Sequence, residues 1–214
     1  MTGLRHGPLS APLHLVVDMQ PLFGPAGPWA VPGIDALLPA CARLLTHAPD
    51  AAAFARFLPA DHPEAAPGQW RTYYRRWSEV TRASLAPELL PVMPELRRLA
   101  PAAPVIDKTG YSAFDPPDLA TLLTTRGTET LVLSGVETDV CVLATALAAV
   151  DRGLRVVLAA DAVTSAEPAM HAAALAILAG RFDLQVEIAP VAEILAHWPT
   201  PAIRPPGSRD DADA

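Results

Sequence analysis

The sequence predicts an α/β fold, a three-layer sandwich with a six-stranded parallel sheet and helices on both of its faces. The first observation is that short aliphatic and β-branched runs alternate along the chain with longer segments of helical periodicity. The second is that several of these short runs end directly in a charged residue, as buried strands do at the carboxyl edge of a parallel sheet. Such alternation is typical of parallel strands joined by helical crossovers.

The length and charge of the chain limit its partners. Its 214 residues suit one domain, expected over residues 1–198 and followed by a mobile tail at 199–214 that is Pro-rich and then acidic. A net charge of −7 and an isoelectric point near 5.3 argue against a nucleic-acid partner. No apolar run reaches the ~18 residues of a membrane span, and the first residues lack the apolar core of a secretory signal. We therefore expect a soluble cytoplasmic protein without a membrane partner.

The first half of the chain is expected to provide three strands. LHLVVD at 13–18 and AAAFARF at 51–57 are continuous apolar runs of the kind found in buried parallel strands. Between them, apolar residues repeat at helical spacing over 34–46, and Cys41 falls on that apolar face, where we expect core packing. PVID at 104–107 is a shorter third strand.

The segment between the second and third strands is less regular. Residues 58–86 show no strand pattern and place aromatic residues among arginines, a composition typical of subunit interfaces and also compatible with a substrate lid. We favour the interface, and hence a homodimer or homotetramer. A helix over 87–100 is predicted to be interrupted at Pro91 and Pro94.

Turn and cap residues divide the second half into elements. Asp115 is predicted to cap a helix that continues through Pro116 to Arg126, with Gly127 closing it. Further strands are predicted at 128–134, 154–161 and 184–188, and further helices at 138–152, 167–179 and 191–197.

The stretch TLVLSGVETDVCVLAT at 130–145 combines a strand, a glycine turn and a helix start. Thr138 or Asp139 is the expected N-cap, because either side chain can accept a hydrogen bond from the first turn. Cys141 then lies in that first turn, where the helix dipole favours a thiolate. A cysteine considered alone is more often a packing residue.

Two charged residues favour a reactive Cys141. Asp18 and Lys108 each follow a predicted strand, and Lys108 is the only lysine in a chain that otherwise uses arginine. Ligands of parallel sheets bind beyond the carboxyl ends of the strands, where these three residues can converge. A carboxylate, an ammonium and a thiol provide a base, a positioning charge and a nucleophile for acyl transfer to a small-molecule substrate.

At these segments the chain resembles the isochorismatase-like cysteine hydrolases. The matching segments are LVVDMQ at 15–20, KTGYSAF at 108–114, GVETDVCVLATALAAVDRG at 135–153, VVLAADAVTS at 156–165 and a helix that bears His171. The resemblance implies a catalytic triad of Asp18, Lys108 and Cys141. It also implies a cis peptide bond between Val136 and Glu137, with the backbone N–H groups of Glu137 and Cys141 forming an oxyanion hole.

The chain differs from two branches of the family at residues that those branches use, and these differences limit the reactions we expect. Nicotinamidases carry an Asp-x-His metal motif and a further His, whereas here Asp61 and His62 are adjacent and no second His follows nearby. We therefore expect no metal and no cofactor. Isochorismatases that cleave a vinyl ether lack the thiol, so Cys141 favours hydrolysis of a C–N bond in a small amide. Nicotinamidase-type or isochorismatase-type activity and a catalytically silent binding or assembly role remain the alternatives.

Other residues near the predicted site have less specific roles. Gln20, Trp70 and Phe114 are candidate substrate-binding residues. His171 is expected to hydrogen-bond a neighbouring loop, and Asp161 to cap or hydrogen-bond the cysteine loop.

Overall fold

The computed structural model describes residues 3–199, so the predicted tail from residue 200 onward lies outside the described residues. Six parallel strands form one sheet in the order β3-β2-β1-β4-β5-β6, which confirms the predicted fold class. The strands are β1 (Pro12–Val17), β2 (Ala52–Phe57), β3 (Val105–Lys108), β4 (Thr130–Gly135), β5 (Arg155–Val163) and β6 (Val186–Ala189). The helices are α1 (Ile34–His47), α2 (Trp70–Arg76), α3 (Pro94–Arg97), α4 (Asp118–Arg126), α5 (Leu143–Val150), α6 (Pro168–Arg181) and α7 (Val191–His197).

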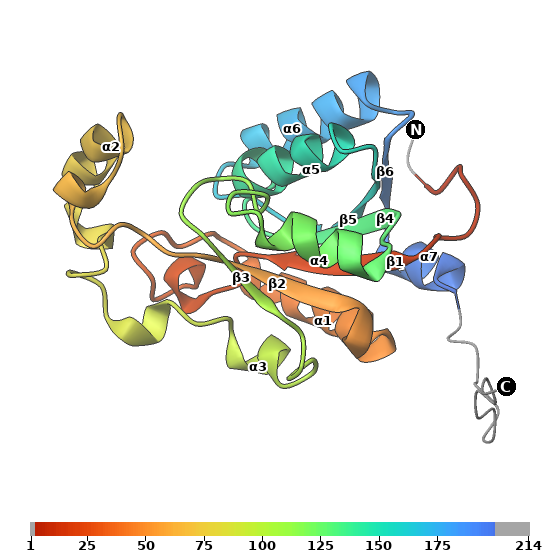
Figure 1. The fold of residues 1–214 in the computed structure, drawn as a ribbon, viewed down its shortest axis with the longest axis horizontal. Coiled ribbons are helices and arrows are strands. Elements are labelled where there is room, and N and C mark those ends of the chain that lie inside the picture. The colour runs from red at the N-terminus through yellow and green to blue at the C-terminus, as the bar shows by residue number, and fades with distance from the viewer. Residues whose placement is uncertain (1–2, 200–214) are drawn as a thin grey trace, which may run out of the picture.

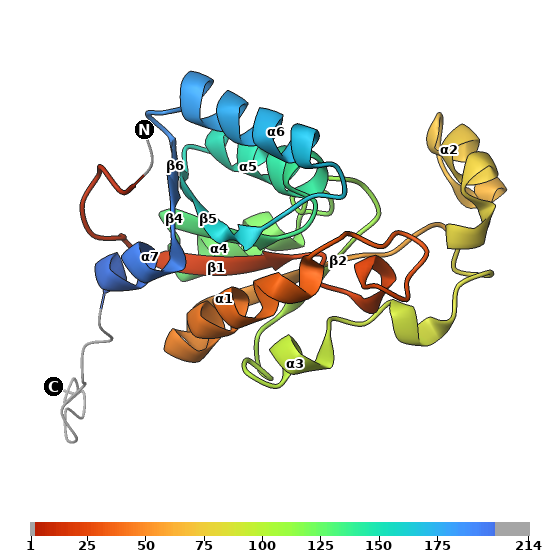
Figure 2. The same ribbon diagram turned by 180° about the vertical axis from the view of Figure 1, so that it is seen from behind.

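The helices cover both faces of the sheet. Helices α4, α5 and α6 lie on one face, and α1, α3 and α7 lie on the other (Figures 1 and 2). Alternate residues of β1 serve the two cores, because successive side chains of a strand point to opposite faces. Leu15 packs with α4 and α5, whereas Val16 packs with α1. Cys41 on α1 is fully buried, as its helical spacing predicted.

The helix predicted over 87–100 is interrupted between Leu89 and Pro94, as expected, and the helix expected from Asp115 begins later than predicted. The segment 87–100 contains a single turn of 3-10 helix at Pro87–Leu89 and the short α3, because each proline lacks an N–H donor. The predicted capping role of Asp115 is wrong: its N–H bonds the carbonyl of Ser112 in a turn, and α4 begins only at Asp118. Gly127 does end α4, in the left-handed conformation.

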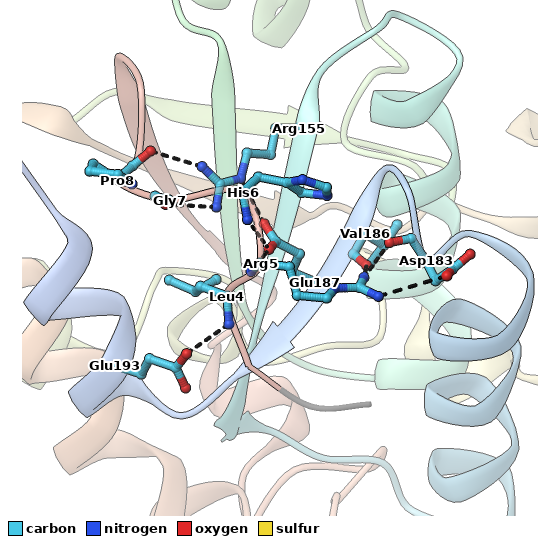
Figure 3. A network of polar contacts seen from close by, with 10 residues as sticks. All are labelled: Leu4, Arg5, His6, Gly7, Pro8, Arg155, Asp183, Val186, Glu187 and Glu193. Atoms are coloured by element: carbon cyan, nitrogen blue, oxygen red, sulfur yellow. Dashed lines mark hydrogen bonds and ion pairs between the residues drawn. The ribbon is translucent and has the colours of Figure 1, made fainter.

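A polar network fastens the first described residues to the edge of the sheet (Figure 3). The Arg155 side chain pairs with Glu187 at 2.7 Å and donates to the carbonyl groups of Gly7 and Pro8. Glu187 also accepts hydrogen bonds from the backbone N–H groups of Arg5 and His6. These contacts join the N-terminal segment to β5 and β6.

Candidate active site

The sheet order brings the three predicted catalytic residues together. Asp18 follows β1, Lys108 ends β3, and Cys141 lies in the turn after β4, so all three stand at the carboxyl edge. The Lys108 ammonium lies 2.7 Å from Asp18 Oδ2 and 3.3 Å from Cys141 Sγ. It also donates to the carbonyl of Gly110 at 3.2 Å and lies 5.0 Å from the centroid of the Phe57 ring. Lys108 and Asp18 are fully buried, and Cys141 is 8% exposed.

The turn before Cys141 requires close approach of two strands. Gly135 has a φ of 107°, and a Cβ on it would lie 1.9 Å from the carbonyl oxygen of Val17. Only glycine fits there. One residue further along the turn, the peptide bond between Val136 and Glu137 is cis.

Cys141 lies on a π-helical turn that leads into α5. This turn spans Thr138–Val142, and the Val142 N–H bonds the carbonyl of Glu137 at 3.1 Å. The N-cap is Glu137, and neither Thr138 nor Asp139 caps the turn with its side chain, so that prediction is wrong. The physical reason is that the Thr138 hydroxyl is directed to α6, where it pairs with His171 Nδ1 at 2.9 Å.

That contact confirms that His171 hydrogen-bonds a neighbouring loop. Asp161 was expected to serve the cysteine loop, but its Oδ1 instead accepts the N–H of Val191 at 2.7 Å. Asp161 therefore anchors the start of α7, because β5 continues through Asp161 to Val163 rather than ending at the carboxylate.

The charges of the triad depend on one another. Burial raises the pKa of the Cys141 thiol and the Asp18 charge raises it further, while Lys108 lowers it. Burial also raises the pKa of Asp18, against the opposing ammonium of Lys108. Burial by itself would lower the pKa of Lys108, but Asp18 and Cys141 outweigh that effect and raise it. Burial of the thiol and the nearby Asp18 charge therefore oppose the thiolate that the helix start favours.

A cavity of about 360 Å³ opens above Cys141. Its lining consists of Phe23, Pro28, Trp29, Ala30, Phe57, Tyr73, Trp77, Tyr111, Glu137, Val140, Cys141 and Ala166. Half of these residues come from the loop after β1 and from the segment around α2, which reaches beyond the sheet (Figure 1). The aromatic composition of residues 58–86 is the sequence signal for part of this wall, in agreement with the alternative that this segment contributes to the substrate pocket.

The three candidate substrate-binding residues do not line the cavity above Cys141. Gln20 is fully buried and holds a loop: its side chain accepts the Phe57 N–H at 2.7 Å and donates to the carbonyl of Leu90 at 2.6 Å. Trp70 lines a second cavity beside the first, and its ring contacts Tyr111 at a centroid distance of 4.9 Å. Phe114 packs in the core beneath α4 and α5. Gln20 and Phe114 lie in matched motifs and Trp70 lies in the aromatic segment 58–86, but a sequence position does not reveal which way a side chain points.

Asp61 and His62 are engaged by other side chains. Asp61 pairs with Arg82 at 2.7 Å, and His62 Nδ1 lies 3.7 Å from Glu64. Among residues 3–199, no group of three or more His, Cys, Asp or Glu side chains could hold a metal ion. Within the same range, every helix is too short or too polar to cross a membrane.

Comparison with known proteins shows which family this chain belongs to. The family model of the isochorismatase domain matches residues 12–189. The chain belongs to the isochorismatase family. The resemblance stated from the sequence motifs is thus confirmed.

Three relatives illustrate the similarity of this isochorismatase-family chain to known proteins. An uncharacterized isochorismatase family protein of Bacillus subtilis is 43% identical over 81 residues, which are 38% of this chain and 44% of that protein. A cysteine hydrolase from Pseudomonas syringae pv. phaseolicola superposes with a TM-score of 0.75 at 22% identity, covering 92% of this chain and 97% of that one. The N-carbamoylsarcosine amidase of Thermoplasma acidophilum gives a TM-score of 0.69 at 22% identity, over 86% and 98%.

These matches differ in what they cover. The chain spans less than half the length of the curated relatives that it matches in sequence. The structural likeness at 22% identity extends over most of the chain and describes a shared fold.

Proposed function

We propose that this isochorismatase-family chain is a cysteine hydrolase that cleaves a C–N bond of a small amide through a thioester acyl-enzyme. The observation that carries the proposal is the contact of one buried ammonium with both a carboxylate and a thiol, at 2.7 and 3.3 Å, at the floor of a cavity. A structural relative of the same fold is named as an amidase, which supports this reaction class.

The proposed reaction begins with a proton transfer. Asp18 takes the proton of Cys141 as Sγ attacks the amide carbonyl, so no thiolate need exist beforehand. Asp18 is close enough to the Cys141 side chain for a hydrogen bond between them to lower the Asp18 pKa, so its carboxylate is placed to receive that proton. The raised pKa of Asp18 suits a base that must hold a proton during the reaction.

The backbone around the turn is proposed to stabilise the tetrahedral oxyanion. The N–H groups of Glu137 and Cys141 would donate to that oxygen. Collapse of the intermediate breaks the C–N bond, and Asp18 returns the proton to the departing amine or ammonia. Water, deprotonated by Asp18, then attacks the thioester carbonyl, the C–S bond breaks to release the carboxylic acid, and Asp18 returns its proton to Cys141 Sγ. Lys108 keeps Asp18 in place and offsets the charge that develops on sulfur.

Amine release and intact-protein mass spectrometry test the proposal together. Wild-type protein is supplied with a panel of small amides, quenched, and examined for an acyl mass on Cys141. Cys141→Ala is expected to abolish both signals, and Asp18→Asn to lower kcat by about a thousand-fold or more. Cys41→Ala is the matched control, because it removes a buried thiol on the other face of the sheet and should leave turnover intact.

The outcomes separate the alternatives. Turnover that persists in Cys141→Ala would contradict a thioester. A correctly folded wild type that hydrolyses none of the amides and is not acylated would favour a binding or assembly role. Turnover that requires added zinc would favour a nicotinamidase-type enzyme, since a pyrazinamidase of Pyrococcus horikoshii with this fold is described in complex with zinc.

We also propose that the chain forms a homodimer or homotetramer through the segment around α2. This helix stands apart from the body of the sheet in both views (Figures 1 and 2), and its three arginines are exposed. Exposed Arg beside aromatic residues is a composition enriched at interfaces. Light scattering after size exclusion would contradict the proposal if the molecular mass were that of a monomer at micromolar concentration.

A further inference from the structure

The cavity above Cys141 is walled by aromatic rings. Six of its lining side chains are aromatic: Phe23, Trp29, Phe57, Tyr73, Trp77 and Tyr111. The Trp29 ring is central, since its centroid lies 6.0 Å from that of Tyr73 and 6.2 Å from that of Trp77, at interplanar angles of 64° and 83°. Rings inclined at such angles face different directions, so a ligand among them meets several π faces.

The charged side chain in the cavity lining is acidic. Glu137 is the charged lining residue, and none of the described lining residues is Lys or Arg. Its Oε2 accepts the Ala166 N–H at 2.7 Å, which fixes the carboxylate in the wall. Lys108 is not in the lining and is already paired with Asp18. An anionic acyl group would therefore find no cationic partner in this wall.

Two rings of the wall already lie near cations. The Lys108 ammonium is 5.0 Å from the Phe57 centroid, and the Arg76 guanidinium is 5.7 Å from that of Trp77. Both distances lie within the ~6 Å range of cation–π attraction. Arg76 is exposed and does not line the cavity.

We propose that this cavity selects amides whose acyl group carries a quaternary ammonium. The proposal rests on the amide hydrolysis proposed above and names its substrate class. Several aromatic faces with one carboxylate form the arrangement that attracts a cation which has no N–H to donate. Such a cation is weakly hydrated for its charge, so moving it into an apolar cavity loses few hydrogen bonds.

Three amides of the form X–CH₂–CONH₂ test the charge preference. Trimethylammonioacetamide is cationic, tert-butylacetamide is its neutral isostere, and malonamate is the anionic comparison. We expect kcat/KM for the cation to exceed that for the isostere by about ten-fold or more, and malonamate to be the poorest substrate. Glu137→Gln should reduce the ratio of cation to isostere. Glu95→Gln, which removes an exposed carboxylate of α3 outside the cavity lining, should leave that ratio unchanged.

Calorimetric titration of Cys141→Ala with the same three amides separates binding from turnover. If wild type hydrolyses no amide while Cys141→Ala binds the cation about ten-fold more tightly than the isostere, the hydrolase proposal fails and the cation site stands. Equal or better use of the isostere or of malonamate, in turnover or in binding, would overturn the cation site. An unchanged ratio in Glu137→Gln would also overturn the assigned role of its carboxylate. Failure of all three amides to bind would overturn the substrate class.

Discussion

Lys108 shows how one residue can control the chemistry of two others. Its ammonium is fully buried and reaches both Asp18 and Cys141, whose pKa values it lowers against the effect of burial. A compact ammonium suits this contact, whereas the planar fork of Arg needs more room. The single lysine of the chain is thus placed where a point charge between two acidic groups matters most.

Removing the ammonium should move the pH profile of turnover. Lys108→Met leaves Asp18 buried without its partner, so the pKa of Asp18 rises further. Because Asp18 must be ionised to accept the proton, the acid limb of kcat/KM is expected to shift to higher pH, with a loss of about a hundred-fold or more at neutral pH. Kinetics over a pH series checks this, and an unmoved acid limb would contradict the role of Asp18 as base.

The reactivity of Cys141 toward iodoacetamide should report the same balance. Burial and the Asp18 charge raise the pKa of Cys141. We therefore expect the midpoint pH of its alkylation rate to lie above the ordinary thiol pKa of ~8.5. Asp18→Asn removes a negative charge and should shift the midpoint down. Lys108→Ala removes a positive charge and should shift it up. Alkylation rates from mass spectrometry give these midpoints, and a wild-type midpoint well below ~8.5 would show a preformed thiolate.

At the scale of elements, the connections after β1 and β4 set the site. Asp18 has a φ of 52°, a left-handed conformation that is uncommon outside glycine, and it follows β1 directly. Across from it, Gly135 ends β4 with its Cα against the carbonyl of Val17. The two strands pair up to this point, where Val17 is the partner of Gly135. The close approach brings Asp18 and the cysteine turn to the same edge.

Gly135→Ala tests this close approach. The added Cβ would lie 1.9 Å from the Val17 oxygen in a backbone conformation of positive φ, so we expect a loss of about 3 kcal/mol or more in the free energy of unfolding. Gly153→Ala is the matched control, because its φ is also positive at 77° but nothing lies within 4 Å. It should cost only about 1 kcal/mol. Urea denaturation measures both, and equal losses would contradict the steric argument.

At the scale of the whole molecule, the two ends of the sheet differ in what they carry. Both cores stabilise the sheet, while the carboxyl edge carries the triad and the aromatic cavity. At the opposite end of the sheet, the network around Glu187 joins residues 5–8 to β5 and β6 (Figure 3). The candidate triad and the contacts that hold the N-terminal segment therefore lie at opposite ends of the sheet.

The Glu187 network should make stability depend on pH. Burial by itself would raise the pKa of Glu187, but hydrogen bonds from the Arg5 and His6 N–H groups and from Arg155 outweigh it and lower the pKa. A carboxyl with a lowered folded pKa contributes stability above its unfolded value of ~4.3 and loses it as the pH falls through the folded pKa. Glu187→Gln is expected to lose about 2 kcal/mol at neutral pH, and the difference from wild type should shrink in acid.

Thermal or urea unfolding at a series of pH values measures that difference. The surface variant Glu95→Gln serves as the control and should differ little from wild type at any pH. A loss in Glu187→Gln that stayed constant below pH ~4 would contradict the contribution of an ionised carboxylate.

The sequence by itself determined the fold class and the three residues of the candidate triad. Apolar runs that end in charge identify parallel strands, and the ends of parallel strands meet at one edge, so Asp18, Lys108 and Cys141 were identifiable from their positions along the chain. Element starts were less predictable, as Asp115 shows, because a capping residue forms turns equally well.

Only the tertiary structure decided which groups shift the pKa of the Cys141 thiol and which residues line the cavity. The pKa of Cys141 depends on burial and on charges brought from two other strands, which local helix position does not reveal. The rings of Trp29, Tyr73 and Tyr111 come from three separate segments, namely the loop after β1, helix α2 and the loop after β3, and local periodicity does not reveal that these segments meet around one cavity. Gln20 and Phe114, which belong to matched motifs, pack away from the cavity above Cys141, and Trp70 lines the second cavity. Contacts between distant segments set these features, because burial and direction are properties of the assembled fold.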